Sequence, residues 1–464
     1  MRPIALSQVA AWVEGRHLGD DVTVEAVGTD TRALPPGALF VALRGEHFDA
    51  HSLIPQAEAA GASALLLHRD VPTSLPRILC ADTEEALGEL AAGLQKGRPA
   101  VVVALTGSNG KTSVKMLTHG ILARAGRTYL NPGNRNNEIG LPLAVIDAPE
   151  DAQFAIYEMG AGKPGDIAYL ASIAPPQVAL VNNIAPAHIE RMGSLLGIAE
   201  TKGAIYEALP DDGVAVINAD DAFAPYFMQI AGSRRIFRFG IENGGDVHAS
   251  RIRHEVDGSR FILHTPAGRA DVRLPLPGVH NVMNALAASA LALAAGADFD
   301  AIVQGLENAA PVKGRQIAHP LGGGAVLVDD SYNANPGSVL AAIATLSQSG
   351  QPAWLVLGDM AELGPGASVL HSEIGSQAKA AGIEGLWTVG KLSRSASAAF
   401  GPGATHFDSQ DALVQALRDA LAARGDGSLR VLVKGSRSSA MDKVVAALLA
   451  DAAGRTTGEG GHAA

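Results

Sequence analysis

The sequence predicts an α/β protein of three domains: a small α/β N-terminal domain, a central domain with a mostly parallel sheet, and a C-terminal Rossmann-like doubly wound domain. The chain has 464 residues, more than one domain normally contains. Apolar residues make up 47% and charged residues only 18%, which supplies enough apolar surface for several cores. Short apolar stretches typical of strands alternate with stretches typical of helices, and this alternation favours parallel sheets covered by helices.

The first domain is expected to span residues 1–98. Its expected elements are strands at 38–43 and 63–68 and helices at 52–62 and 83–97. Gly97, Arg98 and Pro99 suit a linker to the next domain.

The second domain is expected to span residues 99–316. A helix is expected after Lys111, because apolar residues recur there on one helical face. The small apolar residues of 285–297 suit a buried helix better than a membrane span. The expected strands are 100–105, 154–158, 178–183 and 213–218.

The third domain is expected to span residues 317–452 and to repeat the alternation. Its expected strands are 325–330, 353–359, 385–390 and 429–436. The glycines at 322–324 precede a strand, so they do not form the G-x-G-x-x-G turn of dinucleotide-binding proteins. The polar, glycine-rich tail 453–464 is expected to be disordered.

Composition also limits the class of protein. The formal net charge is −11 and no long run of Lys or Arg is present, which disfavours nucleic-acid binding. The single cysteine, Cys80, cannot form an internal disulfide. No signal peptide and no uninterrupted apolar stretch of about 18 residues is evident, so we expect a soluble cytoplasmic protein without a membrane span.

The stretch "TGSNGKTS" follows an apolar strand and begins an amphipathic helix. Glycines let the backbone approach phosphate oxygens, and the helix offers free N–H groups and its positive dipole end. This order predicts a P-loop-type nucleotide-binding domain, although Leu105 stands where the eight-residue pattern needs glycine. The expected phosphate-binding residues are Gly107, Ser108, Asn109, Gly110, Lys111, Thr112 and Ser113.

Polar residues at strand ends are expected to face the same crevice. Glu158 ends one strand and could hold Mg²⁺, and His188 follows the next strand. Lys202 lies in a helical stretch and by itself indicates a solvated lysine. Asn281 is explained by helix capping, whereas Asn284 is less easily explained without a ligand.

The third domain adds further polar residues near its boundary and its strand ends. Arg315 lies where two domains could clamp a phosphate, and Lys434 and Arg437 precede a helix in a way that suits an anion. The loop "LVDDSYNANPGS" contributes Asp330, Tyr332 and Asn333.

Six of these segments together resemble the Mur ligase family, the ATP-dependent amide-forming enzymes of peptidoglycan synthesis. They are "TGSNGKTS", "YEMG", "NNIAPAHIE", "HNVMNALAA", "KGRQ" and "DDSYNANPGS", which occur in the family's order over nearly the whole chain. "TDTRALPPGALFVALRGEHFDAH" and "LGDMAELG" resemble the branch that adds D-alanyl-D-alanine to UDP-N-acetylmuramoyl-tripeptide. The Asp-Asn-Pro-Arg motif of the diaminopimelate-adding branch is missing from the sequence.

The resemblance implies ATP, two Mg²⁺ ions and a catalytic set of Lys111, Lys202, His188 and Glu158, with Lys202 carried as a carbamate. It implies metal ligation by Thr112, Glu158, His188 and carbamylated Lys202. It implies contacts to adenine, phosphate and ribose by Asn281, Asn284, Arg315 and Asp330. The uridine-diphosphate end would contact Thr31, Arg32, Arg44, His47 and His51, and the incoming amino component would contact Tyr332, Asn333, Lys434 and Arg437.

The implied reaction is a ligation through an acyl phosphate, carried out by a monomer and serving cell-wall synthesis, cell shape and division. Another ligase of the superfamily is the nearest alternative, such as a diaminopimelate-adding, lysine-adding or folylpolyglutamate synthase-like enzyme. A P-loop switch or motor and a non-enzymatic sugar-nucleotide binding protein are further alternatives. The sequence leaves open whether the third peptide residue is lysine or diaminopimelate.

Overall fold

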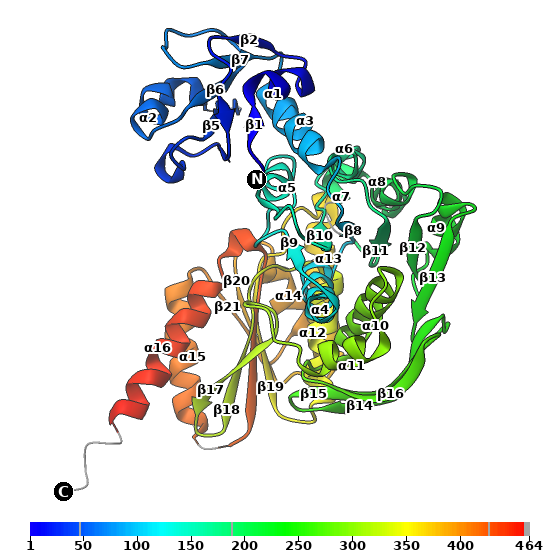
Figure 1. Cartoon of the computed structure of the whole chain (residues 1–464). Helices are drawn as coiled ribbons and strands as arrows, with labels where there is room; N and C mark the ends of the chain where they lie inside the picture. The colour runs from blue at the N-terminus through cyan, green and yellow to red at the C-terminus, as the bar shows by residue number, and fades with distance from the viewer. Residues whose placement is uncertain (46–47, 187–188, 426, 459–464) are drawn as a thin grey trace, which may run out of the picture.

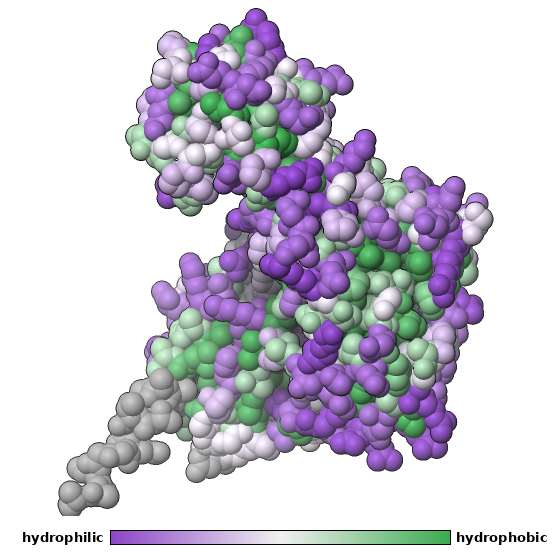
Figure 2. All heavy atoms as spheres, in the orientation of Figure 1, coloured by the Kyte–Doolittle hydropathy of each residue, from purple (hydrophilic) through white to green (hydrophobic). Residues whose placement is uncertain are grey.

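The computed structural model describes residues 1–45, 48–186, 189–425 and 427–458. Figure 1 shows three α/β units, and the predicted fold class is confirmed. Figure 2 shows a wide hollow between the N-terminal and C-terminal units on this face of the molecule. The central unit joins them: α3 (Thr83–Gln95) of the first unit packs on α5 (Gly140–Asp147) and α6 (Asp166–Ile173) of the second.

The N-terminal unit is built on a five-stranded sheet of order β2-β7-β6-β5-β4, parallel except for β2. These strands are β2 (Arg16–Leu18), β4 (Val27–Gly28), β5 (Leu39–Val41), β6 (Ala64–Leu67) and β7 (Arg77–Leu79). The remaining elements are β1 (Ile4–Ala5), α1 (Leu6–Trp12), β3 (Thr23–Val24), η1 (Thr31–Ala33), η2 (Ala50–Leu53) and α2 (Ile54–Ala59). Both predicted strands are confirmed, and the helix expected at 52–62 is divided between η2 and α2.

The central unit holds a nine-stranded sheet of order β16-β15-β14-β13-β12-β11-β8-β10-β9. The parallel strands are β8 (Val101–Thr106), β9 (Thr128–Leu130), β10 (Phe154–Glu158), β11 (Val178–Val181), β12 (Val214–Asn218) and β13 (Arg235–Gly240). The antiparallel extension consists of β14 (Val247–Glu255), β15 (Gly258–Thr265) and β16 (Gly268–Leu274), and the sequence analysis did not predict it.

Helices cover both faces of this sheet, with α4 (Lys111–Ala125) and α10 (Val279–Ala294) packed against each other on one face. The other helices of the unit are α7 (Ile189–Met192), α8 (Leu195–Glu207), α9 (Ala224–Ala231) and α11 (Phe299–Glu307). Because β8 lies between β10 and β11, the carboxyl ends of these three strands meet where α4 begins. The expected buried helix at 285–297 is confirmed by α10, most of whose residues are buried.

The C-terminal unit has a six-stranded sheet of order β17-β18-β22-β19-β20-β21, parallel except for β17. Its strands are β17 (Ile317–Gly322), β18 (Ala325–Asp330), β19 (Ala353–Gly358), β20 (Gly385–Val389), β21 (Ala404–Phe407) and β22 (Leu429–Lys434). Helices on both faces make it doubly wound: α12 (Pro336–Gln348), α13 (Ala367–Ala380), α14 (Ser393–Phe400), α15 (Gln410–Arg424) and α16 (Asp442–Gly458), with η3 (Gly364–Gly366) and η4 (Arg437–Ser439).

The turn at 322–324 and the C-terminal helix can be compared with the sequence-based expectations. The glycines at 322–324 lie at the tight turn between β17 and β18, so they precede a strand as expected. Helix α16 continues to Gly458, so it extends into the segment that was expected to be disordered, and residues 459–464 lie outside the described residues. Within the described residues, every helix is too short or too polar to cross a membrane.

Candidate functional site

A cavity of about 760 Å³ lies where the central and C-terminal units meet. Its walls come from the glycine loop after β8, the start of α10 and the strand-end loops of the C-terminal sheet. Many of the predicted site residues line it: Ser108, Asn109, Gly110, Lys111, Ser113, Glu158, Asn281, Asn284, Arg315, Asp330, Tyr332, Asn333, Lys434 and Arg437. The structure thus brings together residues that are hundreds of positions apart in the sequence.

The glycine loop holds a conformation that only glycine fits. Gly110 has φ 78°, and a side-chain carbon there would lie 2.6 Å from Asn182 Nδ2 and closer still to Asn284 Oδ1. Ser108 Oγ donates to the carbonyl of Ala185 at 3.0 Å, and the Asn109 N–H donates to Asn183 Oδ1 at 2.8 Å. These bonds fasten the loop to the segment after β11 and leave it open toward the cavity.

Lys111 begins α4 and is half-buried over the loop. Its ammonium donates to the Gly107 carbonyl at 2.7 Å. Burial lowers the pKa of Lys111, the carboxylate of Glu158 opposes that shift, and the charge of Arg315 adds to it. The lysine is therefore placed close to the backbone groups that would cradle a phosphate.

Glu158 ends β10 and is only 3% exposed. Its Oε2 accepts a hydrogen bond from Thr112 Oγ1 at 3.0 Å, and its Oε1 accepts one from Asn136 Nδ2 at 2.8 Å. Burial alone would raise the pKa of Glu158, but the charges of Lys115 and Lys111 overcome that effect and hold the pKa below its usual value. An ionised carboxylate and a hydroxyl oxygen thus lie side by side at the entrance to α4.

Lys115 is a residue that the sequence analysis missed. Its Nζ lies 3.2 Å from Glu158 Oε2, and the side chain is 1% exposed. The only sequence signal was its place one turn after Lys111 in the helix that follows the glycine loop.

Lys202 on α8 is buried, so the indication of a solvated lysine is wrong. The residue is 1% exposed. Burial, with a smaller contribution from the charge of Lys111, lowers the pKa of Lys202 well below its usual value. A buried amine of this kind favours its neutral form.

Asn281 and Asn284 form part of a chain of side-chain amides beside the loop. Asn182 Nδ2 donates to Asn284 Oδ1 at 3.3 Å, and Asn284 Nδ2 donates to Asn281 Oδ1 at 3.3 Å. Helix capping does not explain Asn281, because α10 already begins at Val279 and Gly278 occupies the N-cap position. Both asparagines are buried and line the cavity.

The C-terminal unit and its linker contact the glycine loop and the start of α4 directly. Arg315 Nη2 donates to Thr112 Oγ1 at 2.9 Å, and its guanidinium lies over the ring of Tyr332, 4.6 Å from the centroid. Asn335 Nδ2 donates to Asn109 Oδ1 at 2.8 Å. The end of the cavity beside the glycine loop is therefore closed by residues from both units.

Asp330 and Lys434 form a buried ion pair, with Lys434 Nζ 2.6 Å from Asp330 Oδ2. Burial raises the pKa of Asp330, and the charge of Lys434 opposes that effect. Lys434 also donates to the Asn333 carbonyl at 3.0 Å, so both residues belong to one cluster at the ends of β18 and β22. Arg437 is exposed and lies 3.6 Å from Asp442 Oδ2, and Tyr332, Asn333 and Arg437 line the same cavity.

The predicted uridine-diphosphate residues that the structure describes, Thr31, Arg32, Arg44 and His51, lie in the N-terminal unit and do not line this cavity. Thr31 begins η1, and Arg32 pairs with Asp30 at 2.6 Å. The backbone of Arg44 forms an isolated antiparallel β-bridge with that of Asp49. His47 and His188 lie outside the described residues.

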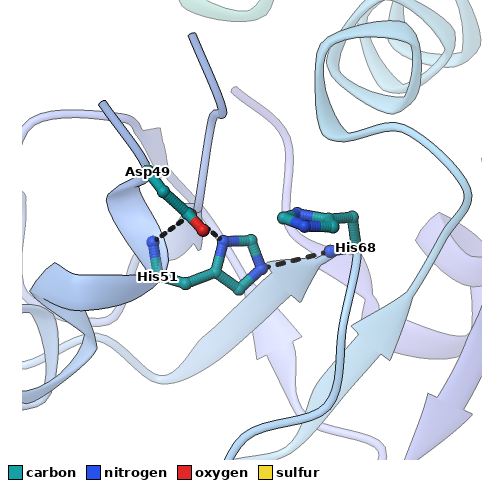
Figure 3. Close-up of side chains that lie close together, drawn as sticks. All are labelled: Asp49, His51 and His68. Carbon is teal, nitrogen blue, oxygen red and sulfur yellow. Dashed lines mark hydrogen bonds and ion pairs between the residues drawn. The ribbon is translucent and has the colours of Figure 1, made fainter. Parts of the chain in front are cut away.

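His51 is fixed by two partners, Asp49 at the start of η2 and His68 just after β6, as Figure 3 shows. Its Nδ1 lies 2.7 Å from Asp49 Oδ1, and its Nε2 accepts the backbone N–H of His68 at 3.3 Å. Asp49, His51 and His68 offer ligand atoms within 4.8 Å of one another, a spacing that could suit a metal ion. Both ring nitrogens of His51 are occupied, however, and Arg69 bonds to Asp49, so the cluster fits a fixed histidine better than a metal site.

Comparisons with known proteins match all three units. The model of the Mur ligase family catalytic domain matches residues 23–95, that of the Mur ligase middle domain matches 105–292, and that of the Mur ligase glutamate ligase domain matches 314–437. The UDP-N-acetylmuramoyl-tripeptide–D-alanyl-D-alanine ligase of Escherichia coli (strain K12) is 46% identical over 449 residues, which cover 97% of this chain and 99% of that protein.

Solved structures agree with these matches. The MurF crystal structure I from Acinetobacter baumannii has a TM-score of 0.93 and 34% identity and covers 97% of this chain and 99% of that one. The MurF ligase from Thermotoga maritima in complex with ADP has a TM-score of 0.84 and 26% identity and covers 93% and 98%. The folylpolyglutamate synthase of Mycobacterium tuberculosis, at 20% identity and a TM-score of 0.64, shares the fold alone. From the glycine loop, the closing third unit and these full-length matches, it follows that the chain belongs to the Mur ligase family.

Proposed function

We propose that this chain is the ATP-dependent ligase that joins D-alanyl-D-alanine to UDP-N-acetylmuramoyl-tripeptide, giving UDP-N-acetylmuramoyl-pentapeptide for peptidoglycan synthesis. The observation that carries the proposal is the contact of Arg315 and Asn335 with the nucleotide-binding loop and its helix. A ligase needs such closure because an activated carboxylate must be shielded from water. The Escherichia coli relative bears this activity in its name and matches nearly the whole chain.

The chemistry begins with a carboxylate that cannot react with an amine at neutral pH, because its leaving group would be oxide. The peptide carboxylate attacks the γ-phosphate of ATP, and ADP leaves. The amine of D-alanyl-D-alanine then attacks the acyl carbon, and phosphate departs. Lys111 and Arg315 reduce the repulsion between the carboxylate and the phosphates, and they act most strongly where water is excluded.

The donor set at Thr112 and Glu158 fits Mg²⁺. The hydroxyl and carboxylate oxygens lie 3.0 Å apart, and Mg²⁺ prefers oxygen ligands. Bound there, Mg²⁺ would neutralise charge on the β- and γ-phosphates. We assign Thr112, Glu158 and His188 as its ligands and expect a second ion held by Lys202 as a carbamate.

Carbamylation of Lys202 is supported by the state of its amine. A neutral amine adds CO₂ and releases one proton, whereas an ammonium has no lone pair for this reaction. Burial and the lowered pKa of Lys202 favour the neutral form. The product is a long carboxylate, which is a suitable ligand for a divalent cation.

The remaining assignments rest on the resemblance to the Mur ligase family. We assign Asn281 and Asn284 to adenine, and Arg315 and Asp330 to phosphate and ribose. Tyr332, Asn333, Lys434 and Arg437 are assigned to the amino component. The uridine diphosphate is assigned to Thr31, Arg32, Arg44, His47 and His51. We also propose that the enzyme acts in the cytoplasm as a monomer.

The proposal is tested by an ADP-release assay with UDP-N-acetylmuramoyl-tripeptide and a panel of D-amino acids and dipeptides. We expect release only when both the tripeptide and a dipeptide such as D-alanyl-D-alanine are present. Tripeptides ending in lysine and in diaminopimelate, compared in the same assay, establish the third residue. Equal turnover without either acceptor would instead indicate a switch or a motor.

A further inference from the structure

We infer that Lys115 is the built-in counter-cation of Glu158, and that it fastens residues 131–137, a wall of the cavity, to the nucleotide-binding helix. Lys115 lies in the second turn of α4 and Glu158 at the end of β10. Both side chains are almost completely buried, with 1% and 4% of their surfaces exposed. The two charges therefore face each other with little water between them.

All three N–H groups of the Lys115 ammonium have a partner. Glu158 Oε2 lies at 3.2 Å, and the carbonyls of Asn131 and Gly133 accept hydrogen bonds at 3.0 Å each. An ammonium has three donors and no acceptor, so this set satisfies it fully. This is the geometry of a buried cation with three fixed partners, and a flexible surface lysine would not keep that geometry.

The position is otherwise unfavourable for a lysine. A cation near the start of a helix opposes the helix dipole, and Lys111 lies four residues before Lys115 on the same helical face as a like charge. Burial of an unpaired ammonium adds a further cost. The carboxylate of Glu158 offsets these three effects, so the pair explains why a lysine is stable there.

Residues 131–137 are attached to Glu158 on both sides of the Lys115 contacts. Asn131 Oδ1 accepts the Glu158 backbone N–H at 2.9 Å, and Asn131 Nδ2 donates to the Glu158 carbonyl at 2.9 Å. Asn136 Nδ2 donates to Glu158 Oε1 at 2.8 Å. Since Asn134, Asn136 and Asn137 line the cavity, Lys115 links the cavity wall to the phosphate end of the site.

The test compares Lys115→Met, which keeps an unbranched side chain only one atom shorter and removes its charge, with the double variant Lys115→Met/Glu158→Gln. Lys96→Met, at an exposed lysine at the end of α3, is the matched control. Thermal unfolding is measured without divalent metal. We expect Lys115→Met to lower Tm by several degrees, the double variant to recover most of that loss, and the control to match the wild type. Removing one partner of a buried pair leaves an uncompensated charge, whereas removing both does not.

Hydrogen exchange tests whether Lys115 fastens residues 131–137 to α4. Peptides that cover residues 131–137 should exchange faster in Lys115→Met than in the wild type. In Lys96→Met, their exchange rate should equal that of the wild type. A double variant as unstable as Lys115→Met, or unchanged exchange in the segment, would overturn the inference. The double variant keeps the test decisive if Lys115→Met alone does not fold.

A third measurement distinguishes the role of Lys115 from the proposed metal site. Only this measurement rests on the proposed function. MgCl₂ should raise the Tm of Lys115→Met more than that of the wild type, relative to NaCl of equal ionic strength, because Mg²⁺ supplies the missing positive charge at Glu158. If the double variant recovers Tm but MgCl₂ shifts none of the proteins, Lys115 remains the counter-cation and the proposed metal-ligand role of Glu158 fails.

Discussion

At the residue scale, the site concentrates positive charge in a chain whose net charge is −11. The charges of Lys111, Lys115 and Arg315 all act on the buried carboxylate of Glu158. Such a local field attracts phosphates and a carboxylate despite the average charge of the surface. The sequence predicted Lys111 from its motif, but it could not predict that Lys115 and Lys202 are buried, because burial of a helical lysine depends on segments far away in the chain.

Replacement of Lys111 by Ala should lower ADP formation at least about a hundredfold, since it removes a charge aimed at the transferred phosphate. Binding of the UDP-linked substrate should stay nearly unchanged, because the cluster around His51 belongs to another unit. ADP release and calorimetric titration measure the two effects separately. Full ligation by this variant would contradict the assigned role.

Replacement of Lys202 by Ala should remove ligation, because the proposed carbamate could no longer form. Acetate or propionate should restore part of the activity by supplying a carboxylate in the space left by the lysine, and they should not rescue Lys111→Ala. Carbon NMR of the wild type in ¹³C-labelled bicarbonate should show a carbamate signal. If neither the rescue nor the signal is observed, Lys202 has a purely structural role.

At the scale of elements, the strand, glycine loop and helix were predictable because their order is local: β8, the loop and α4 follow within one short stretch. The chain of side-chain amides that supports the loop could not be predicted, because Asn182 and Asn284 lie on different elements, 102 positions apart. The antiparallel strands β14–β16 were also missed, since the alternation of strands and helices stops there.

Replacement of Gly110 by Ala tests this support. The left-handed backbone would cost about 1–2 kcal/mol, and the new carbon would also displace Asn182 and Asn284. Gly382→Ala is the matched control, because φ is 79° there and no heavy atom lies within 4 Å of the added carbon. We expect similar losses of unfolding free energy from backbone strain, but a KM for ATP at least about tenfold higher only in Gly110→Ala. That factor corresponds to about 1.4 kcal/mol of binding. Equal KM values in the two variants would show that the amide chain does not shape the loop.

At the scale of the whole molecule, the sequence predicted three α/β units and many of the residues that meet in the cavity. It could not supply the contacts between units, because these join residues 203 and 226 positions apart. Glu158 and Asp330 could be predicted as site residues because both lie at strand ends, and the carboxyl ends of parallel strands lie along one edge of a sheet. The pairing of Asp330 with Lys434, by contrast, depends on the order β18-β22 in the sheet, which no local pattern encodes.

The contact between Asn335 and Asn109 can be separated from the role of Asn335 in its own helix. Asn335 caps α12, where its side chain accepts the Ser338 N–H at 2.9 Å, and it also donates to Asn109 in the central unit. Asn335→Ser keeps a capping oxygen but loses the amide donor, whereas Asn335→Ala loses both and should lower the unfolding free energy by about 1 kcal/mol.

If the contact helps to close the third unit over ATP, both variants should reduce kcat/KM for ATP by a similar factor of about ten, a loss of about 1.4 kcal/mol. Only Asn335→Ala should unfold earlier. Urea unfolding curves and initial rates at limiting ATP measure the two effects on the same samples. Wild-type kinetics in Asn335→Ser, combined with slow turnover in Asn335→Ala, would assign the effect to helix stability and remove this contact from the closing of the molecule.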